Sequence, residues 1–208
     1  KMHERSTYKD NTCHVNCDCG RFLEIGNSVF MEYIKTAGGF KALPNKNVDF
    51  GGGLERMAAA TIDTPDVFMI DAFDAMRSTL ERLSGKTYDS HSPDAKAFRV
   101  ILDHLRAAAF LIADGVIPSN KDQGYFTRRL IRRAVRFGKC LGMKELFCAS
   151  VAQQVVDTYK SHYTQLNARA GDIEREITAE ESKFIKTLVN GEKEFEKMFA
   201  RGYGLSGE

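Results

Sequence analysis

The chain has no tryptophan, only four prolines and few uninterrupted apolar stretches. Its longest apolar run, 107–113, is far shorter than the roughly 20 residues that a membrane-spanning helix needs, so we expect no membrane partner. The polar segment 1–11 lacks the apolar centre of a signal peptide. A large excess of one charge is also absent, because 30 basic and 28 acidic residues leave a net charge of +2. Any binding to nucleic acid must therefore come from a local cluster of charge.

The cysteines are unevenly placed for a disulfide framework. There are five, an odd number, and three of them lie within 13–19. This usage favours a reducing compartment, and we expect a cytoplasmic protein. The composition, 43% hydrophobic and 28% charged, is typical of a globular chain rather than a disordered one. The chain opens on Lys1 and ends in a glycine-rich stretch, 202–208, which we interpret as a loop, so we expect a piece of a longer protein.

Three thiols and an imidazole lie close together at Cys13, His14, Cys17 and Cys19. These soft ligands suit a tetrahedral Zn²⁺ site. A closed site needs a fourth ligand: His14 is strained there because it adjoins Cys13, and His3 or a residue outside this chain are the alternatives. The paired spacing typical of zinc sites is absent, so free thiols or the remnant of a lost site stay open. A catalytic Cys–His pair would need a third, orienting group, which the sequence does not reveal.

A strand that turns through glycines into a helix is predicted at 47–60. Polar and apolar residues alternate over 47–50, and 54–60 contains only good helix formers. The glycines at 51–53 would bring unpaired backbone N–H groups to a helix N-terminus, which favours phosphate binding. Arg56, in the first turn, could fork onto the same phosphate. The alternative is an ordinary glycine-rich turn with a surface arginine.

Strands precede this turn and helices follow it. The segment 21–35 is rich in β-branched and aromatic residues and predicts one or two strands, joined to the turn by a hairpin connection at 36–44. Beyond a boundary near 61–65, apolar residues recur with a period close to 3.6. The helices predicted from this period cover 67–83, 94–114, 123–138, 145–163 and 172–200. The fold class we expect is α+β, with an antiparallel sheet followed by a mainly helical domain.

The helix at 123–138 carries the clearest charge pattern. Its arginines fall within an arc of about 140° at roughly 100° per residue, with apolar residues opposite. They are Arg128, Arg129, Arg132, Arg133 and Arg136, and Tyr125 projects onto the same face. No acid of the helix interrupts this face, which indicates an anionic partner. The alternative is that acids on neighbouring helices neutralise the arginines.

The string from 47 to 60 resembles motif 3 of the class II aminoacyl-tRNA synthetases, and its acid two residues ahead of Gly51 is similar to the alanyl family. The resemblance implies that Arg56 meets the terminal phosphate of ATP in a site that includes Gly51, Gly53 and Glu55. It also implies that Asp49 holds the amino group of alanine, with Val29 and Gly51 lining a small side-chain pocket. This chain has Gly26, Phe50 and Gly52 where the family commonly has Trp, Thr and Met.

The helical part is similar to the tRNA-recognition domain of the same family. Its loop Pro118-Ser119-Asn120 and the helix after it would meet the acceptor stem of tRNA(Ala), with Asn120 reading a G·U pair and Tyr125 and the five arginines contacting RNA. The resemblance implies that 1–63 ends a catalytic domain, that 64–208 recognises tRNA, and that the partners are ATP with Mg²⁺, L-alanine and tRNA rather than DNA. Because motifs 1 and 2 are absent, we expect this chain alone to be inactive. Two alternatives are an RNA-binding module with a non-catalytic synthetase remnant and a helical protein-interaction domain.

Overall fold

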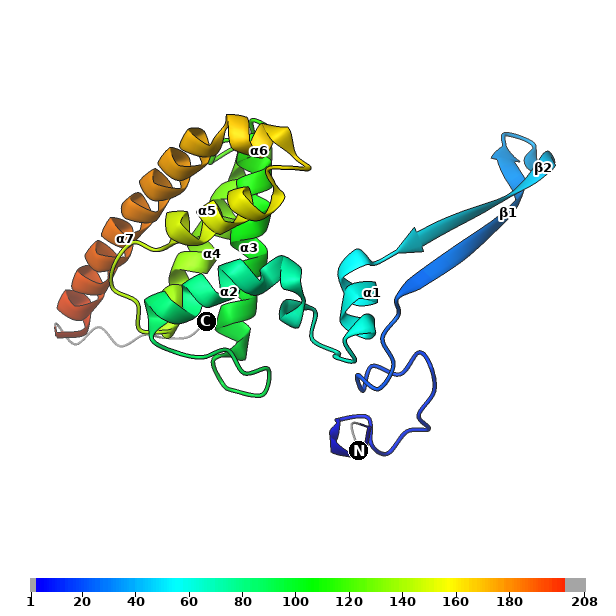
Figure 1. Cartoon of the computed structure of the whole chain (residues 1–208), viewed down its shortest axis with the longest axis horizontal. Coiled ribbons are helices and arrows are strands. Elements are labelled where there is room, and N and C mark those ends of the chain that lie inside the picture. Colours follow the sequence, from blue (N-terminus) through cyan, green and yellow to red (C-terminus); the bar gives the residue numbers. More distant parts are fainter. Residues whose placement is uncertain (1–2, 201–208) are drawn as a thin grey trace. The chain divides into compact units, whose positions relative to one another are not determined.

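The computed structural model describes residues 3–200, so the loop expected at 202–208 lies outside the described residues. These residues form two compact units that divide between Ile70 and Asp71 (Figure 1). The first unit contains a two-stranded antiparallel sheet and short helices, and the second is helical. The expectation of an α+β fold is therefore confirmed. Within residues 3–200, no helix is both long enough and apolar enough to cross a membrane.

The first unit is organised around one hairpin. Its elements are η1 (His3–Arg5), β1 (Gly26–Thr36), β2 (Gly39–Gly52), α1 (Leu54–Thr61) and η2 (Val67–Met69). The hairpin turns at 37–38, so β2 begins inside the segment 36–44 that the sequence predicted to be a connection. Gly39 follows the turn with a φ of 114°, which only glycine adopts without strain. No residue of either strand is buried, so both faces of the hairpin are open.

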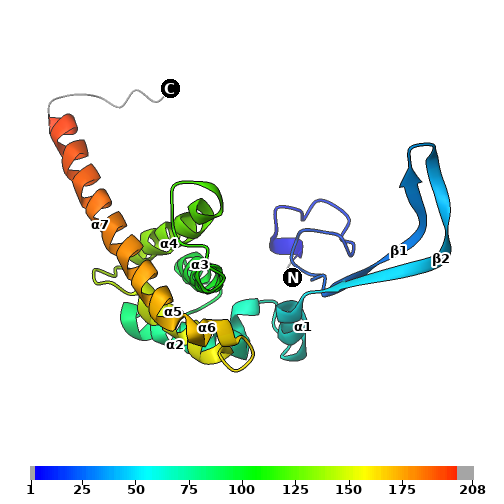
Figure 2. The same cartoon turned by 90° about the horizontal axis from the view of Figure 1, so that it is seen from above.

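The second unit packs its helices around α3 (Ala95–Ala113), as Figure 2 shows. The other helices are α2 (Asp71–Ser84), α4 (Asp122–Cys140), α5 (Cys148–Tyr159), α6 (Thr164–Ala168) and α7 (Ala170–Ala200). The α3 side chains Phe98, Ile101, Leu102, Leu105 and Ile112 are fully buried. A helix is present in each range expected from apolar periodicity, although α5 is shorter than the expected 145–163 and α6 was not expected. The helix expected at 67–83 is broken at Ile70, whose backbone is extended, so η2 and α2 are separate elements.

The start of α5 depends on a buried carboxylate from α7. Glu181 accepts hydrogen bonds from the backbone N–H groups of Phe147 and Cys148, each at 3.1 Å. Burial is the main cause that raises the pKa of Glu181 above its ordinary value, against the opposing effect of these donors. Since the first N–H groups of a helix have no partner within it, Glu181 supplies the cap that the sequence of α5 lacks.

Glu181→Ala is expected to lower the free energy of unfolding by roughly 2 to 4 kcal/mol, because two buried N–H groups lose their acceptor. Urea unfolding followed by circular dichroism measures this change. Glu174→Ala, an exposed position on the same helix, is the matched control and should change stability by less than about 0.5 kcal/mol. Equal effects of the two substitutions would contradict the capping role.

Candidate functional site

The glycine turn between β2 and α1 is closed by contacts with the segment that leads into β1. The backbone N–H of Gly53 donates to the Ile25 carbonyl oxygen at 3.0 Å. Arg56, in the first turn of α1, donates from Nη1 to the Glu24 carbonyl oxygen at 2.7 Å. A Cβ atom at Gly53 would lie 2.6 Å from Arg56 Nε, so the missing side chain is what lets the arginine lie across the turn. A guanidinium has five N–H donors, so this bond leaves four of them for an anion.

The candidate alanine-binding residues share one face of the hairpin. Val29 is the register partner of Asp49, and Asn27 is the partner of Gly51. Directly opposed residues of an antiparallel pair project to the same side of the sheet. The structure therefore brings Val29, Asp49 and Gly51 together beside the glycine turn. Val29 is 53% exposed, so this face is open in the described residues.

The three positions at which we expect a departure from the alanyl-family pattern lie on the other face. Gly26 pairs with Gly52, and Phe50 lies on the same side two residues away. A Cβ atom would be 3.0 Å from Phe50 Cζ if placed at Gly26, and 3.1 Å from Phe50 Cε1 if placed at Gly52. The Phe50 ring thus takes the room that larger side chains at 26 and 52 would need. Gly26, Phe50 and Gly52 thus form one group on the face opposite Val29 and Asp49.

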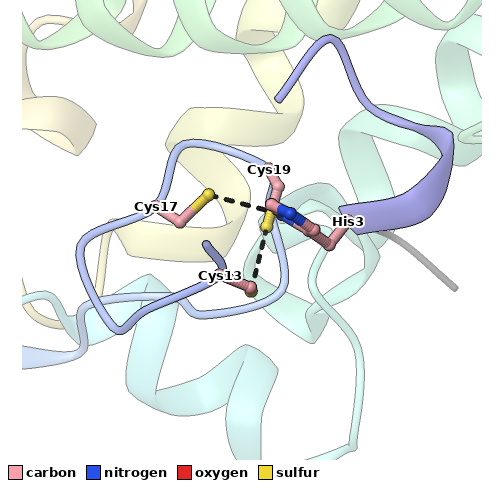
Figure 3. A group of neighbouring side chains, drawn as sticks. All are labelled: His3, Cys13, Cys17 and Cys19. Atoms are coloured by element: carbon pink, nitrogen blue, oxygen red, sulfur yellow. Dashed lines mark hydrogen bonds between the residues drawn. The ribbon is translucent and has the colours of Figure 1, made fainter. Parts of the chain in front are cut away.

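The three cysteines of the segment 13–19 lie close to His3 rather than to His14 (Figure 3). The ligand atoms of His3, Cys13, Cys17 and Cys19 all lie within 4.8 Å of one another. The sulfurs of Cys13 and Cys19 are 3.9 Å apart, and Cys17 Sγ is 3.5 Å from His3 Nδ1. His14 lies outside the group, and its Nδ1 accepts a hydrogen bond from the Asn16 N–H at 3.2 Å. The tentative assignment of His14 as the fourth ligand is therefore replaced by His3, because the loop turns His14 away.

Backbone donors surround this Cys–His group. The N–H of Arg21 donates to Cys19 and is the largest cause that lowers the pKa of that thiol to about 7. The N–H of Cys19 donates to Cys17 and lowers its pKa, but desolvation and the neighbouring thiols outweigh this effect and raise it. The pKa of His3 is raised, first by its hydrogen bond with Cys19 and then by the bond to the Asn11 carbonyl.

In the second unit, the candidate RNA-binding residues lie together. A pocket of about 400 Å³ is lined by Asn120, Tyr125, Arg128, Arg129, Arg132, Arg133, Arg136 and Phe184. All seven residues singled out in the sequence are in this list, and Phe184 of α7 is added to them. We call this pocket and its rim the basic face. Asn120 reaches it from the loop before α4, and the other sequence-predicted residues come from α4 itself.

One buried acid modifies the charge of the basic face. Glu180 of α7 pairs with Arg132 at 2.5 Å and with Arg128 at 3.4 Å. The Arg132 guanidinium also lies 5.0 Å from the centre of the Phe184 ring. The expectation of an uninterrupted positive face is thus wrong for two of the five arginines, because α7 packs against this side of α4. Among residues 3–200, Arg129, Arg133 and Arg136 are exposed and form no ion pair.

Sequence reasoning did not find Glu180 or Phe184. The α7 sequence contains many acids at similar spacing, and only packing shows which one reaches α4.

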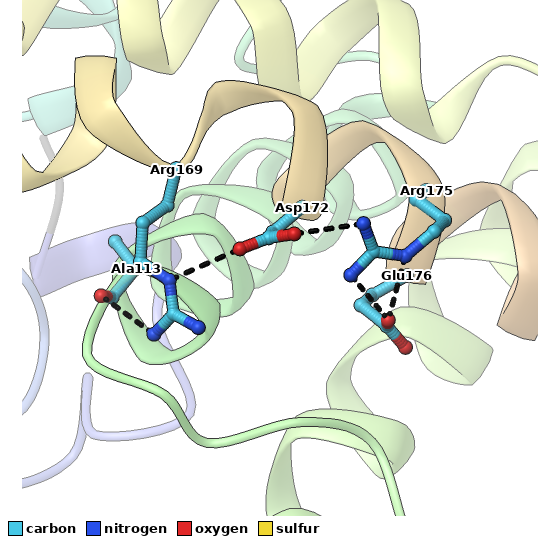
Figure 4. A network of polar contacts seen from close by, with 5 residues as sticks. All are labelled: Ala113, Arg169, Asp172, Arg175 and Glu176. Carbon is cyan, nitrogen blue, oxygen red and sulfur yellow. Dashed lines mark hydrogen bonds and ion pairs between the residues drawn. The ribbon is translucent and has the colours of Figure 1, made fainter.

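The start of α7 is anchored by a separate network (Figure 4). Arg169 donates to the Ala113 carbonyl at the end of α3 and to Asp172, which also pairs with Arg175 at 2.7 Å. Arg175 first, and then Arg169, lower the pKa of Asp172. This network is structural and fastens α7 to α3.

The loop that carries Asn120 packs directly on the first turn of α4. The N–H of Ser119 donates to the Gly124 carbonyl oxygen at 3.0 Å. A Cβ atom at Gly124 would lie 2.4 Å from both the Ile117 carbonyl oxygen and Ser119 Oγ. Gly124 is therefore required for the loop to approach the helix so closely. This contact sets Asn120 at the edge of the basic face.

Comparison with known proteins covers the residues of both the glycine turn and the basic face. A family described as tRNA synthetases class II (A) matches residues 2–207. The chain belongs to that family. Its sequence is similar to proteins named alanine–tRNA ligase, with 44% identity to that of Borreliella afzelii over 189 residues, covering 89% of this chain and 32% of the relative. The chain is 44% identical to the Chlamydia caviae protein over 172 residues, covering 82% of this chain and 20% of that relative.

A third relative of the same name, from Acetivibrio thermocellus, is 41% identical over 180 residues, which are 86% of this chain and 20% of that protein. The resemblance of this class II synthetase chain to the alanyl family is thus confirmed. The chain spans about a third to a fifth of the length of the curated relatives that it matches.

Proposed function

We propose that this class II synthetase chain is the part of an alanine–tRNA ligase that completes the adenylate site and holds the tRNA acceptor stem. The observation that carries the proposal is the placement of Val29, Asp49 and Gly51 on one hairpin face next to the glycine turn that Arg56 crosses. A carboxylate beside a small apolar side chain suits the ammonium and methyl groups of L-alanine. A glycine turn with an arginine at a helix N-terminus suits the phosphates of ATP.

The proposed reaction has two steps. In the first, the carboxylate of alanine attacks the α-phosphorus of ATP, which forms alanyl-adenylate and releases pyrophosphate. In the second, a ribose hydroxyl at the 3′ end of tRNA(Ala) attacks the activated carbonyl, and AMP leaves. ATP binds as its Mg²⁺ complex, in which the metal neutralises part of the phosphate charge.

The residues of this chain contribute positioning and charge to the first step. Arg56 would bind the terminal phosphate of ATP. The Gly53 N–H, which the sequence predicted to be unpaired, donates to the Ile25 carbonyl oxygen and so serves to close the turn. Glu55, in the first turn of α1, completes the candidate ATP site. Asp49 would hold the alanine ammonium, while Val29 limits the size of the side chain that fits. No covalent bond to the protein is needed.

The basic face supports the tRNA half of the proposal. The exposed arginines Arg129, Arg133 and Arg136 would contact backbone phosphates, which supply most of the affinity for nucleic acid. Tyr125 offers an aromatic ring beside them. Asn120 can both donate and accept hydrogen bonds, and the wide minor groove of RNA exposes the edge of a G·U pair to such a side chain.

Alanine-dependent exchange of pyrophosphate into ATP tests the function. The chain alone should show no exchange, because motifs 1 and 2 are not in it. A chimera in which this chain replaces the matching stretch of the Borreliella afzelii relative should show exchange that depends on alanine. Exchange by the chain alone would contradict its proposed dependence on other segments. A folded chimera without exchange would contradict the ligase proposal.

Two other functions predict different results in the same assays. An RNA-binding module with a non-catalytic remnant would bind an acceptor-stem hairpin while its chimera stays inactive. A protein-interaction domain, which the Glu180 pairs with Arg128 and Arg132 favour, would bind no RNA and would bind its partner with little dependence on salt. A cytoplasmic location is part of the proposal and rests on the cysteine usage, because an odd, clustered set of five does not suggest a disulfide framework.

A further inference from the structure

We propose that His3, Cys13, Cys17 and Cys19 bind one structural Zn²⁺ ion. This ion would stabilise the segment that leads to Glu24, whose carbonyl oxygen accepts a hydrogen bond from Arg56. Two of the six separations between the ligand atoms match the edges of a zinc tetrahedron, and all six are within 4.8 Å. Bonds of about 2.3 Å to sulfur and about 2.0 Å to nitrogen at tetrahedral angles place two sulfurs about 3.8 Å apart, and a sulfur and a nitrogen about 3.5 Å apart. The observed distances are 3.9 Å between Cys13 and Cys19, and 3.5 Å between Cys17 Sγ and His3 Nδ1.

The surroundings of His3 are those of a metal ligand. Its Nε2 lies 2.8 Å from the Asn11 carbonyl oxygen, to which only an N–H can donate. That bond places the proton on Nε2 and leaves the Nδ1 lone pair facing the thiols. A ligating histidine ordinarily donates its other ring N–H in this way, which fixes both the tautomer and the orientation of the ring. The bond spans eight residues, so it is not a consequence of local helix geometry.

The thiols have matching support from the backbone. The N–H groups of Cys19 and Arg21 donate to the sulfurs two residues before them, Cys17 and Cys19. Gly20, between Cys19 and Arg21, has a φ of 79°, a left-handed conformation that glycine adopts without strain. Such bonds stabilise thiolates. Arg21 Nη1 also lies 3.8 Å from Cys13 Sγ, where it offsets the net negative charge of three thiolates on Zn²⁺.

A metal at this point would connect two parts of the first unit and stabilise the segment that follows them. His3 comes from η1, and the cysteines come from the loop at 13–19. Three and four residues beyond Arg21, Glu24 and Ile25 present the carbonyl oxygens that accept hydrogen bonds from Arg56 and Gly53. Among residues 3–69 only Cys19, Ala59 and Asp66 are buried, so apolar packing gives this segment little stability. The importance of this stabilisation for Arg56 rests on the proposed function, but the presence of the metal does not.

Metal analysis of the purified 208-residue chain tests the site directly. We expect one zinc per chain by inductively coupled plasma mass spectrometry. Replacement with Co²⁺ should give the thiolate charge-transfer and tetrahedral d–d absorption bands of a Cys₃His site. Cys19→Ser should remove both signals. His3→Gln should weaken Zn²⁺ binding at least about 10-fold in competition with a chelator dye.

His14→Gln and Cys140→Ser are the matched controls, because each removes the same chemical group from a residue outside the site. Both should keep full metal content. The helices of the second unit provide a folding check by circular dichroism for every variant. Removal of the metal should also speed limited proteolysis at Arg21, a readout that does not depend on ligase activity.

Three results would overturn the proposal. The first is a chain without bound metal that takes up no Zn²⁺ when reduced. The second is a Cys13–Cys19 disulfide that persists in the chain when it is purified with a mild reductant, which would make the two thiols a redox pair. The third is loss of zinc in His14→Gln with retention in His3→Gln, which would assign a different fourth ligand. Loss of exchange activity in a chimera that retains its zinc would instead count against the proposed function alone.

Discussion

Arg129→Glu combined with Arg133→Glu is expected to weaken binding of an alanine-type acceptor-stem hairpin by about 100-fold or more at moderate salt. Both arginines are exposed on the basic face and form no ion pair among residues 3–200, although Arg133 lies near enough to Asp103 to lower the pKa of that carboxyl, after the larger effects of His104 and Arg106. The slope of log affinity against log salt should decrease in magnitude by roughly 2 in the variant, because two phosphate contacts are lost. Fluorescence anisotropy across a salt series measures both quantities.

The matched control carries the same change in charge elsewhere. Lys96→Glu combined with Lys144→Glu alters two exposed residues of the second unit that do not line the basic face. It should keep most of the affinity and nearly all of the salt slope. Equal losses in the two double variants would mean that net charge, rather than the basic face, controls binding. Unchanged binding in the Arg129 and Arg133 variant would place the RNA elsewhere.

A substitution at Glu180 is expected to have the opposite effect on RNA binding. Glu180→Gln removes the one negative charge that pairs with Arg128 and Arg132, so RNA binding should become tighter by a few-fold and more dependent on salt. A protein-interaction domain whose arginines serve only internal pairing would show a different result. In that case the substitution would reduce stability without creating any affinity for RNA.

Arg56→Ala in the chimeric enzyme is expected to lower alanine-dependent pyrophosphate exchange by about 100-fold to 1000-fold, because a charge-assisted donor to the reacting phosphates is removed. Arg56→Lys should recover only part of the activity, since an ammonium group cannot reproduce the planar fork. The Glu24 carbonyl oxygen, 2.7 Å from Nη1, sets the orientation of this fork. Initial rates at varied ATP and alanine concentrations measure the effect.

Two further variants show whether a substitution affects the alanine site or the ATP site. Asp49→Asn should raise the KM for alanine more than the KM for ATP, because it removes the charge that faces the ammonium group. Arg82→Ala, an exposed arginine of α2, should leave both constants unchanged. If Arg56→Ala affected only the KM for alanine, the assignment of Arg56 to the phosphates would be wrong.

Much of the secondary structure could be predicted because it depends on local chemistry. The period of the apolar residues predicted α2 to α5 and α7, and the glycines at 51–53 predicted the strand-to-helix turn. The hairpin connection was predicted less well: β2 starts at Gly39 because pairing with β1 extends Phe40 and Lys41 into the ladder. Such pairing depends on the partner strand, which periodicity within one segment does not describe.

The sequence by itself determined the order of elements, the arginine pattern of α4 and the set of residues that could bind phosphate or metal. Each of these follows from residue type and short-range spacing. Only the tertiary structure decided which partners meet. It brought His3 to the cysteines across a loop, Glu180 and Phe184 of α7 to the arginines of α4, and the Phe50 ring over Gly26 and Gly52. These contacts join residues on different elements or loops, and their geometry depends on how those elements pack rather than on the sequence of either one.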